Sequence, residues 1–216
     1  MKSLLTYGIM LGLLFCCSSC SSSTDSSSQP SRIAYTMQVN SLGNEITDNS
    51  DALYVTSVRL VLETFELGLD NGPTVVVNPS EIEARVDDTE EGNSVQLFSN
   101  TVAGGTYRST SFGVGLADDI SVENPEYSIL VTGTYGGTEF TFGTDIVFRR
   151  DFNFTGALFI PNQDFAVDVT ITTDIEDWFT DREGAVLDPM ASENRSLIET
   201  NIETSFDIEI TGSSTE

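Results

Sequence analysis

The chain has 216 residues, of which 9 are basic, 34 are acidic and none is histidine, so its formal net charge is −25. A surface this negative repels nucleic acid and anionic lipid, and the absence of histidine excludes His-based catalytic triads and imidazole metal sites. Solubility in salty surroundings is the simplest explanation of so many acids, and a preference for cations or basic partners is the alternative.

Residues 1–19 have the pattern of a signal peptide. Lys2 supplies a positive start, and Leu4–Phe15 is an apolar run that is short for a membrane span. The sequence CCSSC follows, and its last cysteine, Cys20, resembles the lipid-carrying cysteine of the lipobox in bacterial lipoproteins, although Cys17 stands where an aliphatic residue is usual. An ordinary secretory signal cut near Ser21 is the alternative.

Cleavage before Cys20 would leave one acylated cysteine and no disulfide, because all three cysteines lie in this segment. More than one acyl chain on Cys20 would hold the protein at a membrane. Residues 20–31 form the lipidated cysteine and a serine-rich tether, whose eleven residues after Cys20 reach roughly 18 Å. Ser21 resembles the sorting residue of outer-membrane lipoproteins in Gram-negative bacteria, so the expected location is the outer membrane. Residues 32–216 are expected to form a single domain.

The first strand is predicted over Arg32–Asn40, where four residues predicted to face inward alternate with more polar ones: Ile33, Tyr35, Met37, Val39. The central strand follows at Ala52–Leu67, the longest run rich in β-branched and aromatic residues. Its inward positions are predicted to be Tyr54, Val58, Leu60 and Leu62, while Ser57, Arg59 and Glu63 meet water. The inward parity then moves to Phe65 and Leu67, which predicts a β-bulge near Glu63–Thr64. An amphipathic helix is the alternative, and five β-branched residues disfavour it.

Further strands are predicted wherever this alternation returns between turn signals. The clearest is a hairpin across Gly136-Gly137, because two glycines can both take positive φ in a tight turn. Near the C-terminus, Ser192 is predicted to cap a helix of about ten residues before a last strand at Phe206–Ile210. Nine or ten short strands and one short helix indicate an all-β, antiparallel two-sheet sandwich.

The order of these segments resembles a set of uncharacterised bacterial envelope lipoproteins with an immunoglobulin- or transthyretin-like β-sandwich. The resemblance spans Arg32 to Thr211 and rests on four stretches: VTSVRLVLETFEL, VAGGTYRSTSFGVGL, YSILVTGTYGGTEFTF and DIEDWF. It implies a fold and a surface setting, and it implies no reaction and no catalytic residues.

Acidic loops are the candidate chemical sites, since calcium takes six to eight oxygen ligands that loops often supply. The candidate ligands are Asp87, Asp88, Glu90, Glu91, Asp118 and Asp119, with Asp174, Glu176 and Asp177 as a further group. Counting from Asp87, the twelfth position is Phe98 rather than Glu, so the first loop is not an EF-hand. Solvated acidic loops are the alternative explanation.

Trp178 beside Asp177 and Asp181 offers a sugar-binding platform, with a core-edge aromatic residue as the alternative. We therefore expect a non-catalytic, lipid-anchored envelope protein that binds or scaffolds an envelope protein or glycan, without a cofactor. A calcium-dependent glycan-binding or adhesion module is the second hypothesis. A hydrolase that uses two carboxylates is the third.

Overall fold

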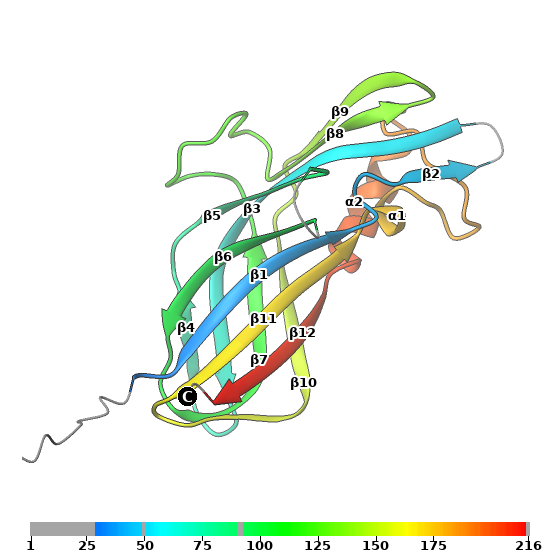
Figure 1. The fold of residues 1–216 in the computed structure, drawn as a ribbon. Helices are drawn as coiled ribbons and strands as arrows, with labels where there is room; N and C mark the ends of the chain where they lie inside the picture. The colour runs from blue at the N-terminus through cyan, green and yellow to red at the C-terminus, as the bar shows by residue number, and fades with distance from the viewer. Residues whose placement is uncertain (1–28, 49–50, 90–92, 215–216) are drawn as a thin grey trace, which may run out of the picture.

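A computed structural model describes residues 29–48, 51–89 and 93–214, and it shows two facing β-sheets with helices at one end (Figure 1). The smaller sheet has the order β12 (Asp207–Ser214), β11 (Phe165–Asp174), β1 (Arg32–Asn40), β6 (Ser94–Thr101). The larger sheet has the order β10 (Phe148–Ile160), β7 (Gly105–Val114), β3 (Asp51–Leu69), β8 (Ile129–Tyr135), β9 (Thr138–Thr144). Three shorter strands also pair with β3: β2 (Glu45–Asp48), β4 (Thr74–Asn78) and β5 (Ile82–Asp87). The predicted all-β fold of two sheets is confirmed, and its strand pairing is mostly antiparallel.

The central position of β3 is confirmed by its pairing with five other strands. Residues 57–60 of β3 pair with β5 on one edge and with β8 on the other. Further along, β4 and β7 take the two edges, and β2 pairs with the start of the strand. This 19-residue strand therefore holds both halves of the larger sheet together.

The pairing of β3 is irregular at several points, and bulges at two of them change which of its side chains face the core. The predicted one lies between Glu63 and Glu66 in the pairing with β7, and Thr64 has a φ of 34° there. The other lies between Val55 and Ser57 in the pairing with β8, and it was not predicted. Because the bulge between Val55 and Ser57 shifts the alternation, Val55 is buried and Tyr54 is only half-buried. The predicted inward placement of Tyr54 is therefore wrong.

The core between the sheets consists of aliphatic and aromatic side chains from both layers. All four predicted inward residues of β1 are buried: Ile33, Tyr35, Met37, Val39. Tyr35 stacks on Phe98 with ring centroids 4.9 Å apart and meets Phe65 edge-on at 5.1 Å.

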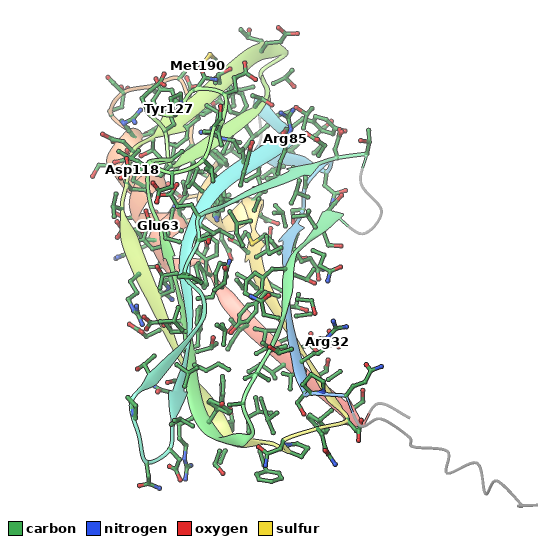
Figure 2. All side chains as sticks on the ribbon, turned by 90° about the vertical axis from the view of Figure 1, so that its left-hand side faces the viewer. Arg32, Glu63, Arg85, Asp118, Tyr127 and Met190 are labelled. Carbon is green, nitrogen blue, oxygen red and sulfur yellow. The ribbon has the colours of Figure 1, made fainter. Side chains whose placement is uncertain are left out.

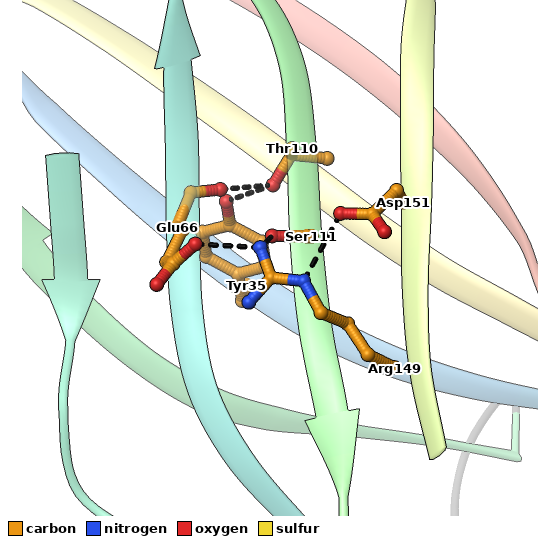
Figure 3. Close-up of polar contacts among 6 residues, drawn as sticks. All are labelled: Tyr35, Glu66, Thr110, Ser111, Arg149 and Asp151. Atoms are coloured by element: carbon orange, nitrogen blue, oxygen red, sulfur yellow. Dashed lines mark hydrogen bonds and ion pairs between the residues drawn. The ribbon is translucent and has the colours of Figure 1, made fainter. Parts of the chain in front are cut away.

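One polar chain crosses this core (Figure 3). The hydroxyls of Tyr35 and Thr110 lie 2.7 Å apart, and Thr110 donates to the backbone oxygen of Glu66 at 2.9 Å. On the outer side, Arg149 of β10 reaches across β7 to the Glu66 carboxylate at 2.5 Å and pairs with Asp151 at 3.1 Å. These contacts link β10, β7 and β3 to β1.

The β8–β9 hairpin is confirmed, with φ values of 54° and 78° at Gly136 and Gly137. The wholly antiparallel expectation fails at one pair, since β1 and β11 run parallel. Alternation of side chains does not encode strand direction. A parallel pair needs a long connection, and here nine strands lie between β1 and β11 in the described part of the chain. Twelve strands are present in that part, where nine or ten were predicted.

The C-terminal region contains two helices, α1 (Ile175–Trp178) and α2 (Arg195–Thr204), where one was predicted. The ten residues of α2 match the predicted length. Its N-cap is Asn194, without a side-chain capping bond, so the capping role of Ser192 is wrong. Within the described ranges, no helix is both long and apolar enough to cross a membrane. The predicted signal peptide, Cys20 and most of the tether lie outside these ranges.

Candidate functional site

The predicted acidic loops do not converge on one point. Asp87 pairs with Nε of Arg85 at 3.3 Å, and Asp88 accepts a hydrogen bond from the Tyr54 hydroxyl at 2.9 Å. Glu90 and Glu91 lie outside the described residues, so their part in a calcium site stays a prediction. Residues 29–48, 51–89 and 93–214 contain no group of three or more acidic, histidine or cysteine side chains placed to hold a metal.

The other two acidic groups have local structural roles. The backbone N–H groups of Asp118 and Asp119 both donate to one carboxylate oxygen of Glu81, at 3.0 and 2.9 Å. Asp174 caps α1, because its carboxylate accepts from the N–H of Glu176 at 3.0 Å. Each loop is thereby ordered by hydrogen bonds within the protein.

Trp178 cannot be a sugar platform, because its side chain is fully buried. Its indole Nε1 donates to the hydroxyls of Thr173 and Ser205, at 2.7 and 2.6 Å, and its ring lies 6.2 Å from Phe206. The nearby carboxylate of Asp181 accepts from two backbone N–H groups in its own turn. Of the two interpretations of this residue, the structure excludes the sugar platform and supports the core-edge aromatic residue.

A different set of residues lines a groove on the outer face of the larger sheet. One hollow of about 540 Å³ and a second of about 210 Å³ share Thr132 and Thr141, so they form one surface across β3, β8 and β9. We call it the threonine groove, after the threonines that line it: Thr56, Thr132, Thr134, Thr141. Its narrower end reaches β5 and is lined by charged and amide side chains: Arg59, Glu83, Arg85, Glu123, Asn124.

At the wider end of the threonine groove, the bulge between Val55 and Ser57 and close backbone contacts fix the spacing of β3 and β8. Thr56 occupies the bulge and its hydroxyl donates to the backbone oxygen of Thr132 at 3.1 Å. At Gly133 the strands are so close that an added Cβ would lie 2.1 Å from the backbone oxygen of Tyr54. The threonines therefore stand on strands whose spacing is fixed by backbone contacts.

The narrower end is closed by residues 115–128, which join β7 to β8; we call these residues the covering segment. Arg59 is only 4% exposed, and its guanidinium donates to the backbone oxygens of Glu123, Asn124 and Tyr127, the last two at 3.2 and 2.6 Å. Its Nε is buried and has no hydrogen-bond partner in the described protein. The expectation that Arg59 meets water is wrong because the covering segment lies over it.

Burial of Val61 has the same cause. Its N–H donates to the Ser128 oxygen at 2.8 Å, and its oxygen accepts from Gly115 N–H at 3.1 Å. An apolar residue on the polar face of β3 was the signal in the sequence that something covers this face. The sequence did not show which segment it was.

The covering segment meets a carboxylate cluster at its other end. Figure 2 shows Glu63 and Asp118 on the face that carries Tyr127 higher up. Burial raises the pKa of Glu63, and the negative charges of Glu81 and Asp118 raise it further. One end of the segment is thus attached to a buried cation and the other lies among crowded acids.

Comparisons with known proteins show a distant likeness in fold. No model of a known family matches the chain, and no curated protein does. Among solved structures, MbnP from Methylosinus trichosporium is 14% identical, covers 71% of this chain and 79% of its own, and has a TM-score of 0.38. A candidate cell adhesion protein from Bacteroides eggerthii is 14% identical with a TM-score of 0.28; the match covers 86% of this chain and 55% of that one.

Proposed function

We propose that this protein is a non-catalytic binding or scaffolding module, held at the bacterial cell envelope by lipid on Cys20, and that the threonine groove is its ligand surface. The observation that carries the proposal is the groove itself. Threonine hydroxyls on paired strands line its wider end, and amide and charged side chains line its narrower end. Such groups can hydrogen-bond a polar ligand in a defined register. The sequence features that support the location are the lipobox-like cysteine and the serine-rich tether.

The lining of the groove favours an uncharged, hydroxyl-rich ligand such as a glycan. Two arginines and two glutamates line the narrower end and Glu139 adds one negative charge at the wider end, so the lining is nearly neutral, whereas the chain as a whole is strongly acidic. Arg59 directs its guanidinium to the covering segment, so it shapes the groove rather than offering a free charge. The acids that line the groove, Glu83, Glu123 and Glu139, form no group placed to hold a metal within the described residues, and we propose that the groove binds its glycan independently of calcium.

The ligand surface can be tested by filling it. Thr132 belongs to both hollows, so Thr132→Arg should block binding along the whole groove. Thr170→Arg makes the same change at a half-buried residue of β11 in the other sheet, and it serves as the matched control. We expect signals on a glycan array that Thr132→Arg removes and Thr170→Arg keeps, with and without a calcium chelator.

A blank array for the unmodified protein would refute the glycan function. Equal loss in both variants would refute the groove as the ligand surface. Binding that disappears with the chelator would instead support the calcium-dependent module.

The location is tested separately by mass spectrometry of the mature N-terminus, where the absence of acyl mass on Cys20 would refute lipid anchoring.

A further inference from the structure

Within the described part of the chain, the two sheets end side by side in strands that pair with only one neighbour. β10 is the last strand of the larger sheet and β12 is the last strand of the smaller one. Both lie along the same side of the sandwich (Figure 1). Each therefore presents one edge of unpaired backbone groups, which is a template for pairing with another strand.

A groove of about 420 Å³ lies between these two edges, and we call it the edge groove. Its apolar lining comes from Phe152 and Phe154 of β10 and from Ile208 and Ile210 of β12, all half-buried and packed on the core. On each strand these residues are two positions apart. That spacing is the side-chain period of an extended strand.

The backbone of β10 is also open beside the edge groove. Its pairing with β7 covers residues 148–153 and 158–160, and it leaves residues 154–157 outside the ladder. Two large apolar side chains near the opposite ends of β10 are strongly exposed, Val147 at 65% and Phe159 at 66%.

The rim of the edge groove is acidic. Asp151 stands on one side with its side chain 68% exposed, and Asp207 and Glu209 are exposed on the other side. Two arginines of β10 lie nearby: Arg149 pairs with Asp151, and the guanidinium of Arg150 lies 5.6 Å from the ring centroid of Phe152. No ion pair is formed by Asp207 or Glu209 within the described chain. With a formal charge of −25, a second copy of this chain would be repelled, so charge complementarity selects a basic occupant.

We propose that the edge groove binds an extended, basic peptide segment of another protein by strand addition. Backbone hydrogen bonds to the β10 or β12 edge would supply affinity, alternate apolar side chains would enter between Phe154 and Ile210, and lysines or arginines would meet the acidic rim. This surface is separate from the threonine groove, so the proposal stands whether or not that groove binds a glycan.

The test measures fluorescence anisotropy of labelled peptides with the full chain purified in a mild detergent. The probes are KVTVKVTVK, the acidic version EVTVEVTVE, and KVTPKPTVK, whose prolines prevent strand pairing. We expect saturable binding of the first with a Kd below about 100 µM, and at least about tenfold weaker binding of the other two.

Two matched pairs of variants place the site. Ile210→Asp adds a charge inside the edge groove and Thr211→Asp adds one at the next, exposed residue, so only the first should abolish binding. Should Ile210→Asp unfold, Thr155→Lys at the exposed rim should weaken binding of the basic peptide, and Thr138→Lys on β9 should not. Folding is checked by circular dichroism.

No saturable binding of KVTVKVTVK up to about 1 mM would overturn the proposal. Equal binding of the basic and acidic peptides, or equal effects within each variant pair, would also overturn it. So would a dimer in sedimentation that Ile210→Asp dissociates while no peptide binds, because the occupant would then be a second copy of the chain.

Discussion

Replacing Arg59 with methionine tests whether a buried cation organises the covering segment. The change keeps an unbranched apolar stem and removes the guanidinium, which donates three hydrogen bonds to backbone oxygens of residues 123, 124 and 127. Each hydrogen bond from a charged donor contributes about 1.5–3 kcal/mol, for a gross loss of about 4.5–9 kcal/mol. Removing the buried charge recovers several kcal/mol of desolvation, so we expect a net loss of about 2–4 kcal/mol in the free energy of unfolding.

Urea unfolding followed by the fluorescence of Trp178 measures this loss, because Trp178 is the only tryptophan and is buried. With a slope of about 2 kcal/mol/M, the midpoint should fall by about 1–2 M. Amide hydrogen exchange should rise in residues 117–127 before it rises elsewhere. Arg85→Met is the matched control, since its side chain is 58% exposed and its pair with Asp87 contributes at most about 1 kcal/mol.

Two outcomes would refute this reasoning. One is an unfolding free energy of Arg59→Met within about 0.5 kcal/mol of the parent, as for an ordinary surface change. The other is unchanged exchange in the covering segment despite a large loss of stability, which would mean that Arg59 supports the sheet and not the segment. Arg59→Lys should fall between parent and methionine variant, because an ammonium cannot reproduce the planar donor fork.

The remaining predictions concern three other positions. The raised pKa of Glu63 means that the folded state holds the proton of this carboxyl more tightly than the unfolded state, so its contribution to stability should fall as pH rises from about 4.3. Glu63→Gln should therefore raise the Tm at neutral pH and flatten this dependence in a pH series. A lower Tm for the variant would contradict the prediction. Gly133→Ala should lower the free energy of unfolding in urea by about 3 kcal/mol or more. Gly156→Ala, with nothing within 4 Å of its added Cβ, should change it by less than about 1 kcal/mol. Similar values for the two variants would show that β3 and β8 can separate. Trp178→Phe should cost about 2–4 kcal/mol by circular dichroism, because two hydroxyls lose their donor and a cavity opens, and a neutral effect would mean that the pocket re-forms around phenylalanine.

Local chemistry was enough to predict the β-sandwich. Alternating side chains identified β1 with its inward residues, and the change of parity after Glu63 identified a bulge. Two glycines predicted the β8–β9 turn. These features depend on neighbours along the chain, so the amino-acid order reports them directly.

Long-range contacts account for what the amino-acid order did not disclose. The parallel pairing of β1 with β11, the cover over Arg59 and the burial of Trp178 each join residues far apart in the chain. The same holds for both grooves: Thr132 contacts Thr56 at a bulge, and Phe154 and Ile210 line one groove because two sheet edges end together. Side-chain patterns state which face of a strand is buried, but the partner that buries it is chosen by how the sheets fold over one another.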